Sequence, residues 1–357
     1  MKNETLSRGK KALFVIGVVG MALAAGVAGA ALVANYAVSS LTFSTVTSNV
    51  STRPATKVDV TKVGTATRSS VVFYKKHTGS SVLDKVFLPS DAVGAGVVLT
   101  ADGWLMSSSS VFASHDQLVA VFSDRTAVNV NTEKAIHDEA TGLAYIKVEA
   151  QHLAVAVFGD DTTLQSADPV FSISADNVVA SNVVAPRRLP VATRADYIES
   201  SEYLGRRILI DKSGLVGSLV VDANGVMMGI DEGNKNVVPV TFVSDVLRDL
   251  FKDGKVARPQ IGVRYISLDN LPILKNSGLP TTGALVTGDG KVRSVEKGSV
   301  AEKAGLRESD VITMIERDRI NNEATLSERL QDYVPGAKVE LTVVRDGATL
   351  KLPLTLK

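Results

Sequence analysis

Serine, histidine and aspartate are the residues of this chain that could carry covalent chemistry. Cysteine is absent, which excludes disulfides, thiol nucleophiles and cysteine-ligated metals. A serine nucleophile needs a base and an orienting carboxylate, with about 2.6–3.2 Å at each hydrogen-bonded link. The order His…Asp…Ser can be drawn with His115, the pair His137-Asp138, and either Ser213 or Ser218. The elements that hold these side chains decide whether they can meet.

The chain around Ser213 and Ser218 predicts a tight turn followed by a β-hairpin. LVVDANGVMMGI, from Leu219 to Ile230, is two apolar runs joined by a turn. Asn224-Gly225 favours that turn because both residues tolerate positive φ. The preceding residues, GLVGSL from Gly214, form a small-residue turn that leads into the hairpin.

Two earlier segments predict further strands. GAGVVLTADGWLMSSSSVF, residues 94–112, reads as strand, Asp102-Gly103 turn, strand and a short helical turn. DQLVAVFSDRTAVNVNTEKAIHDEATGLAYIKV, residues 116–148, reads as two strands and a loop that returns to a buried strand.

These segments resemble the HtrA family of trypsin-like serine proteases. The family's nucleophile turn, Gly-Asn-Ser-Gly-Gly-Pro, falls on GLVGSL and puts Val216 at the serine position. Residues 94–112 resemble the base-bearing segment and put Ser110 at the histidine position. Residues 116–148 put Gly142 at the aspartate position. Valine has no attacking oxygen and a serine hydroxyl is no base near neutral pH, so the resemblance implies an active-site frame without its triad.

The resemblance implies a mainly β fold, with a trypsin-like double six-stranded β-barrel followed by an α/β PDZ domain. Residues 158–188 resemble the start of the family's second barrel. Gly214 and Gly217 keep the backbone permissive where relatives form an oxyanion hole, and whether that hole forms stays open. An apolar i, i+3, i+4, i+7 pattern from Val243 predicts a helix that Gly254 ends.

About the last hundred residues resemble an HtrA-type PDZ domain, through the signature GSVAEKAGL followed by DVI. PDZ domains bind an extended peptide as an added strand and cap its C-terminal carboxylate with backbone amides. The resemblance implies a carboxylate loop and a groove helix wall. Their candidate peptide-binding residues are Arg258, Ile261, Gly262, Val263, Thr325, Leu326 and Arg329. For Leu326, core packing is an equally good interpretation.

Composition narrows the partners. A 45% hydrophobic content with 39 basic and 38 acidic residues gives a net charge of +1, which favours neither nucleic acid nor an acidic substrate. No metal, nucleotide or redox cofactor site is visible in the sequence. Protein or peptide C-termini are the expected ligands, and the family implies a homotrimer or a heterotrimer with active relatives.

The N-terminus predicts a membrane anchor. An apolar run from Ala12 to Ala34 spans roughly 34 Å as a helix, enough for a hydrocarbon core of about 30 Å. Basic residues precede it, so the tail stays cytoplasmic and the rest is extracytoplasmic on the cell membrane. A cleaved signal peptide is the alternative. The expected domains are a tail (1–11), an anchor (12–38), a Ser/Thr-rich stalk (39–67) with a short strand at 57–63, a protease-like domain (68–253) and a PDZ domain (257–357).

Two functions follow. The first is a pseudoprotease that binds peptides or protein C-termini for scaffolding, regulation or envelope quality control without cleavage. The alternative is an active serine endopeptidase that uses the displaced residues His115, His137-Asp138, and Ser213 or Ser218. A nucleophile displaced along a tight turn generally points elsewhere, which favours the first.

Overall fold

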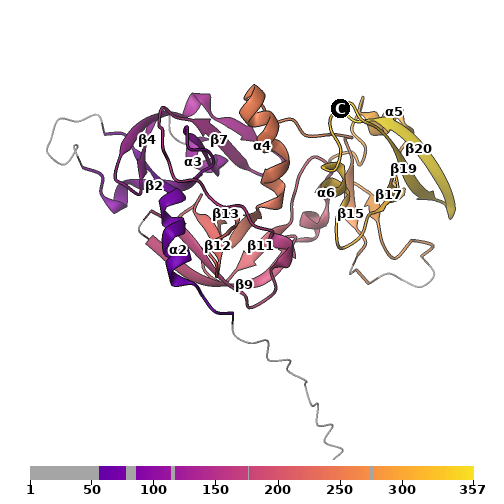
Figure 1. Cartoon of the computed structure of the whole chain (residues 1–357). Helices are drawn as coiled ribbons and strands as arrows, with labels where there is room; N and C mark the ends of the chain where they lie inside the picture. The colour runs from indigo at the N-terminus through magenta and orange to yellow at the C-terminus, as the bar shows by residue number, and fades with distance from the viewer. Residues whose placement is uncertain (1–55, 78–85, 114–116, 176, 270, 273–276) are drawn as a thin grey trace, which may run out of the picture. The chain divides into compact units, whose positions relative to one another are not determined.

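The structure, a computed structural model, describes residues 56–77, 86–113, 117–175, 177–269, 271–272 and 277–357 (Figure 1). Internal contacts divide the chain into Met1–Ala55 and Thr56–Lys357, and all described residues belong to the second unit. The predicted tail and anchor, and residues 39–55 of the predicted stalk, lie outside the described residues. No helix within the described ranges is long and apolar enough to cross a membrane.

The first sheet has the strand order β5-β4-β1-β2-β3-β7-β6 and is antiparallel throughout. Its strands are β1 (Ser70–Lys75), β2 (Ala92–Val98), β3 (Trp104–Ser108), β4 (Gln117–Phe122), β5 (Ala127–Asn131), β6 (Ile136–Asp138) and β7 (Leu143–Lys147). Helix α3 (Ser109–Ala113) follows β3 directly. The sheet encloses an apolar core that includes Phe73, Leu105 and Leu118. The prediction of six strands here was wrong, because the three-residue strand β6 pairs with β7 and makes a seventh.

The second sheet is a closed six-stranded barrel, which confirms the prediction for this half. Its strands are β8 (Pro169–Ser174), β9 (Asn177–Arg188), β11 (Arg207–Ile210), β12 (Leu219–Asp222), β13 (Met227–Gly233) and β14 (Asn236–Pro239). The hairpin of β12 and β13 turns at Asp222, whose carboxylate accepts the amides of Asn224 and Val226. Helix α4 (Thr241–Asp253) follows and ends at Gly254 in the left-handed region, as predicted.

The strand expected at 57–63 is a helix instead. Helix α2 (Val60–Ala66) begins after Asp59, whose side chain accepts the amide of Lys62. Val63 is buried in the barrel core and Ala66 packs against that core, so one helical face is apolar. The Asp59 amide also donates to the carbonyl of Ala223 in the turn of the β12–β13 hairpin. The end of the predicted stalk is therefore part of the folded barrel (Figure 1).

The third sheet belongs to the PDZ region, with the order β10-β15-β16-β17-β19-β20 and β18 paired to β17. Its strands are β10 (Glu199–Ser200), β15 (Arg264–Ser267), β16 (Ala284–Val286), β17 (Val311–Ile315), β18 (Asp318–Arg319), β19 (Lys338–Arg345) and β20 (Ala348–Thr355). Helices α5 (Val300–Lys303) and α6 (Leu326–Leu330) accompany it. Strand β10 comes from the segment between β9 and β11, so the protease-like region contributes the edge strand of the PDZ sheet.

Short 3-10 helices connect these elements. They are η1 (Thr67–Ser69), η3 (Pro89–Asp91), η4 (Thr132–Lys134), η5 (Asp161–Thr163) and η6 (Arg194–Tyr197). The last of them lies just before β10.

Gly217, after the Val216 position, offers a test of the turn. It has a φ of +88°, and a Cβ there would lie 2.0 Å from the carbonyl oxygen of Ala95. Gly254 has a φ of +62° with nothing within 4 Å of a Cβ, so it is a matched control. We expect Gly217→Ala to lower the free energy of unfolding by about 3 kcal/mol or more, and Gly254→Ala by about 1–2 kcal/mol, in urea titrations. Equal losses would contradict the close approach of the two segments.

Candidate functional site

The turn at the nucleophile position holds the two halves of the protease-like region together. The carbonyl of Val216 accepts the amide of Ala95 at 2.7 Å, and the amide of Gly217 donates to the carbonyl of Asp231 at 2.7 Å. The Val216 side chain packs against the apolar core of the first sheet. Its Cγ2 lies 3.1 Å from where a Cβ of Gly233 would be. An apolar side chain therefore occupies the nucleophile position.

A buried carboxylate accepts a hydrogen bond from the backbone that would form an oxyanion hole. That hole needs the amides of the nucleophile and of the residue two positions before it, here Val216 and Gly214. The amide of Gly214 donates to Asp231 Oδ2 at 2.7 Å. Asp231 is fully buried and also accepts from Ser172 Oγ at 3.0 Å and from the amide of Gly233 at 2.9 Å. One of the two donors therefore already binds an internal anion.

A second carboxylate lies beside the aspartate position. Gly142 has a φ of +78°, and a Cβ there would lie 3.3 Å from Glu232 Oε1. The buried Arg207 holds Glu232 through its Nε at 2.7 Å, and its Nη2 donates to the carbonyl of Thr141 at 3.1 Å. An aspartate at position 142 would meet a strained backbone and a like charge.

The base position lies on helix α3. Ser110 Oγ is 2.9 Å from Ser108 Oγ. The neighbouring Ser109 donates its amide to the carbonyl of Gly142 at 2.9 Å, which brings the base and aspartate positions together. Ser109 Oγ lies 3.2 Å from His137 Nδ1 but donates its own proton to the carbonyl of Leu143 at 2.8 Å. A hydroxyl whose proton points away from the histidine is poorly placed for activation.

The displaced triad is not assembled among the described residues. Ser213 Oγ accepts the amide of Lys235 at 2.7 Å, while the buried Ser218 donates to the carbonyl of Leu215 at 2.6 Å. Asp138 binds an arginine rather than a histidine. His115 lies outside the described residues.

Asp138 and Arg258 form a buried ion pair. Arg258 Nη2 lies 2.7 Å from Asp138 Oδ2, and Nε lies 2.9 Å from Oδ1. The guanidinium also donates to Gln331 Oε1 at 2.9 Å and to the carbonyl of Phe242 at 2.6 Å. All three guanidinium nitrogens of Arg258 therefore bind groups of this chain. As placed, this predicted peptide-binding residue joins the protease-like region to the PDZ region and does not offer a peptide contact.

The predicted carboxylate loop has the expected form. Gly262 has a φ of +82°, and a Cβ there would lie 2.5 Å from the Cβ of Ser299, so the turn requires glycine. The amides of Ile261 and Gly262 point to one oxygen, Glu202 Oε1, at 3.0 and 2.7 Å. The amide of Val263 donates to Ser201 Oγ at 3.0 Å. The loop therefore binds a carboxylate, and that carboxylate belongs to this chain.

Helix α6 carries the predicted groove residues Leu326 and Arg329, with Thr325 at its N-cap. Leu326 is fully buried in the PDZ core, in agreement with the alternative of core packing. Thr325 caps the helix, and Arg329 Nε donates to the carbonyl of Arg319. The described contacts of these three residues are thus within the PDZ region.

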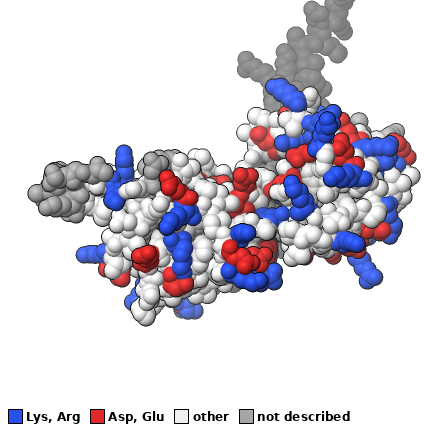
Figure 2. All heavy atoms as spheres, turned by 90° about the horizontal axis from the view of Figure 1, so that it is seen from above, with Lys and Arg blue, Asp and Glu red and all other residues white. Residues whose placement is uncertain are grey.

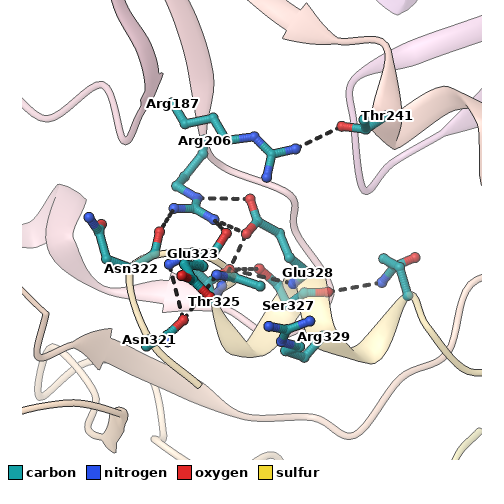
Figure 3. A network of polar contacts seen from close by, with 12 residues as sticks. Arg187, Arg206, Thr241, Asn321, Asn322, Glu323, Thr325, Ser327, Glu328 and Arg329 are labelled. Carbon is teal, nitrogen blue, oxygen red and sulfur yellow. Dashed lines mark hydrogen bonds and ion pairs between the residues drawn. The ribbon is translucent and has the colours of Figure 1, made fainter. Parts of the chain in front are cut away.

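Arg206 binds Glu328 of α6 and the loop that precedes this helix (Figure 3). Its guanidinium forms a bidentate ion pair with Glu328, with Nε at 2.8 Å from Oε1. It also donates to the carbonyls of Asn322 and Glu323 at 2.6 and 3.0 Å. Both Arg206 and Glu328 side chains are less than a tenth exposed. The sequence analysis did not predict roles for Arg206, Glu328 and Glu202. Nothing in residues 197–207, YIESSEYLGRR, indicates that this segment adds an edge strand to a later domain.

Glu199 is buried in the same region, and its surroundings raise the pKa of its carboxyl group. Burial, together with the nearby Glu328 carboxylate, raises the pKa of Glu199 to about 7 against the opposing effect of Arg206. Its Oε2 atom is buried without a hydrogen-bond partner. The neutral acid is therefore the favoured form of this side chain in the folded state below about pH 7.

The distribution of charged side chains on the surface is mixed. On the face seen in Figure 2, basic and acidic side chains are interspersed over the described residues. Residues able to hold a metal in groups of three or more were not found within the described ranges.

Comparison with known proteins matches the C-terminal region to a domain family and finds relatives of the longer chain. Residues 259–356 match the PDZ domain family. A probable periplasmic serine endoprotease, DegP-like, of Pseudomonas putida (strain W619) is 27% identical over 284 residues, covering 75% of this chain and 56% of the relative. The serine protease Do-like HtrA of Lactococcus lactis subsp. cremoris (strain MG1363) is 26% identical over 378 residues, covering 94% and 92%. The chain thus spans about half the length of the DegP-like relatives but nearly all of the Lactococcus protein.

Solved structures with a similar fold are also HtrA-type proteases. The HtrA-type protease AlgW, solved with a decapeptide, superposes with a TM-score of 0.59 at 21% identity, covering 83% of this chain and 97% of that one. The fold is therefore that of a barrel-type trypsin-like protease domain followed by a PDZ domain. The chain is similar to HtrA-type serine endoproteases, and its residues 259–356 match the PDZ domain family.

Glu199 makes the stability of the protein depend on pH. A folded-state pKa of about 7, above the ordinary 4.5, means that the stability from this group is full below about pH 4.5 and is lost as the pH rises through 7. We expect Glu199→Gln to raise the free energy of unfolding by up to about 3 kcal/mol near pH 8 and to change it little near pH 4. Urea titrations at both values measure this, with the exposed Glu308→Gln as control. The same gain at both values would contradict the assignment.

Proposed function

We propose that this chain is a peptide-binding homologue of the HtrA-type proteases that does not cleave its ligands. It acts outside the cytoplasm and is held at the membrane by residues 12–38. In this role the PDZ domain recognises protein C-termini, and the protease-like region serves as scaffold or regulator. An assembly with active relatives stays a prediction.

The observation that carries the proposal is the hydrogen bond from the Gly214 amide to Asp231 Oδ2. The residues Ser110, Gly142 and Val216 at the triad positions remove the chemistry, but substitutions alone could leave a serviceable cleft. Asp231 also weakens the electrostatic stabilisation, since its carboxylate accepts the Gly214 amide, which is one of the two donors that a developing oxyanion would need. Loss of one oxyanion-hole donor costs about 10²–10³ in rate even with a triad present.

The alternative is an endopeptidase with a Ser109–His137 pair. The 3.2 Å contact between Ser109 Oγ and His137 Nδ1 favours it. Against it, the Ser109 hydroxyl donates to Leu143 and the Ser109 amide donates to Gly142, so the amide of that serine is not available as an oxyanion donor. We therefore retain binding without cleavage as the function.

Restoring the triad tests this account of the cleft. We expect the natural chain, and the variant with Ser110→His, Gly142→Asp and Val216→Ser, to stay unlabelled by a fluorophosphonate probe and to leave unfolded casein intact. Adding Asp231→Ala frees the Gly214 amide, and adding Glu232→Gln removes the like charge while keeping a partner for Arg207. The five-fold variant is the one in which we expect labelling to begin.

One result would contradict the proposed function, and another would contradict only the role of Asp231 in the cleft. Labelling of the natural chain that disappears in Ser109→Ala would identify an active endopeptidase with a displaced nucleophile. Labelling of the three-fold variant as fast as the five-fold one would leave the non-cleaving function intact but show that Asp231 does not block the oxyanion hole.

A further inference from the structure

The peptide-binding elements of the PDZ domain are all described, so their occupancy can be read directly. A PDZ ligand adds an antiparallel strand to the sheet edge, beside a helix, and its C-terminal carboxylate binds the amides of a loop. Here the outermost strand that the PDZ region itself supplies is β15, the helix is α6, and the loop is residues 261–263.

The strand position is filled by β10. Glu199 lies opposite Tyr265 and Ser200 lies opposite Arg264, in antiparallel register. The pairing continues where the Ser201 amide donates to the carbonyl of Val263 at 2.8 Å. Residues 199–201 therefore have the backbone geometry of a bound peptide.

The carboxylate position is filled by the side chain of Glu202. Its Oε1 accepts the amides of Ile261 and Gly262, at 3.0 and 2.7 Å. The hydroxyls of Ser201 and Ser200 donate to Oε1 and Oε2, both at 2.8 Å. Charge-assisted bonds of this kind are stronger than neutral ones, and this carboxylate accepts four of them.

The neighbouring residues hold this segment in place. Glu199 is buried next to Tyr265 and Glu328, and Ser201 is fully buried. Four residues after Glu202, Arg206 binds Glu328 on α6. The segment is thus fixed on the groove at both of its ends.

We infer that residues 199–202 are an internal ligand of the PDZ groove, with the Glu202 carboxylate standing in for a peptide C-terminus. This inference rests on the proposed peptide-binding function. It adds that an external peptide can bind only after it displaces residues 199–202 from the groove. The ligand that fits is a peptide with a free C-terminal carboxylate and a small last residue, since the last position is that of the fully buried Ser201.

Tethering explains how a short segment can compete with free peptides. An internal ligand on a short linker acts at an effective concentration of about millimolar. The apparent dissociation constant of an external peptide rises by the inverse of the fraction of open grooves. Ligands that bind weakly are excluded, and the groove opens to those that bind tightly or are themselves presented at high local concentration.

The test uses a peptide with the sequence of residues 195–201, ADYIESS, carrying fluorescein at its N-terminus and a free C-terminal carboxylate. Its binding is measured by fluorescence anisotropy to the full chain in mild detergent. We expect Glu202→Ala to tighten binding by about 10-fold or more, because the internal segment loses charge-assisted bonds worth at least that factor. Glu308→Ala should leave binding unchanged, and a peptide with a C-terminal amide should bind neither protein.

The outcomes separate the two claims. Equal affinity of the natural chain and Glu202→Ala for the carboxylate peptide would overturn the internal ligand and leave peptide binding intact. No binding to either protein would overturn both the ligand assignment and the proposed function.

A disulfide gives a second, independent test, because the chain has no cysteine of its own. Residues directly opposite in an antiparallel pair have Cα atoms about 4.5–5.5 Å apart, within disulfide range. We expect Ser200→Cys/Arg264→Cys to cross-link on mild oxidation and to lose peptide binding until it is reduced. The control pair Gln117→Cys/Asn131→Cys, opposite each other in β4 and β5, should cross-link without affecting binding. Failure of the Ser200–Arg264 pair to cross-link, when the control does, would place residues 199–202 outside the groove.

Discussion

Backbone amides that would receive an anion bind carboxylates of this same chain at two places. Asp231 binds the amide of Gly214 in the protease-like cleft, and Glu202 binds the amides of Ile261 and Gly262 in the PDZ loop. Buried donors are costly to leave unpaired, so an internal carboxylate stabilises each loop in its present form. The same interaction removes the site from an incoming oxyanion or C-terminus. In the proposals above, the same kind of contact therefore acts against an oxyanion in the cleft and against a peptide C-terminus at the PDZ loop.

The two places are joined by one short stretch of chain. Residues 199–202 lie in the PDZ groove and Arg206 binds α6, while Arg207 lies against Thr141 and Glu232 beside Gly142. The amide of Leu204 donates to the carbonyl of Ala140, close to the buried Asp138–Arg258 pair. Displacement of the groove segment would therefore pull on residues that border the cleft.

The sequence predicted the local elements well, because their signals are local. The Asn224-Gly225 hairpin, the helix ending at Gly254 and the loop turn at Gly262 depend on residues that prescribe their own backbone. Where tertiary packing decides, the prediction from sequence was wrong: 57–63 has β-compatible residues, but helix α2 begins at Val60, since Val63 and Ala66 share a face that the barrel buries. Arg258 looked like a carboxylate ligand because it precedes the loop, and only the fold brings Asp138 to it. The role of Glu202 could not be predicted, since its partners lie about sixty residues further along the chain.

The central claim, that internal carboxylates fill both anion-binding positions, is tested most directly by hydrogen exchange of the Gly262 and Gly214 amides in the ligand-free full chain, followed by NMR. Both amides lie in loops, where exchange is fast unless a hydrogen bond protects the proton. The account predicts slow exchange at both, and selective loss of protection at Gly262 in Glu202→Ala and at Gly214 in Asp231→Ala. Exchange of either amide in the natural chain at the rate of an open loop would contradict it.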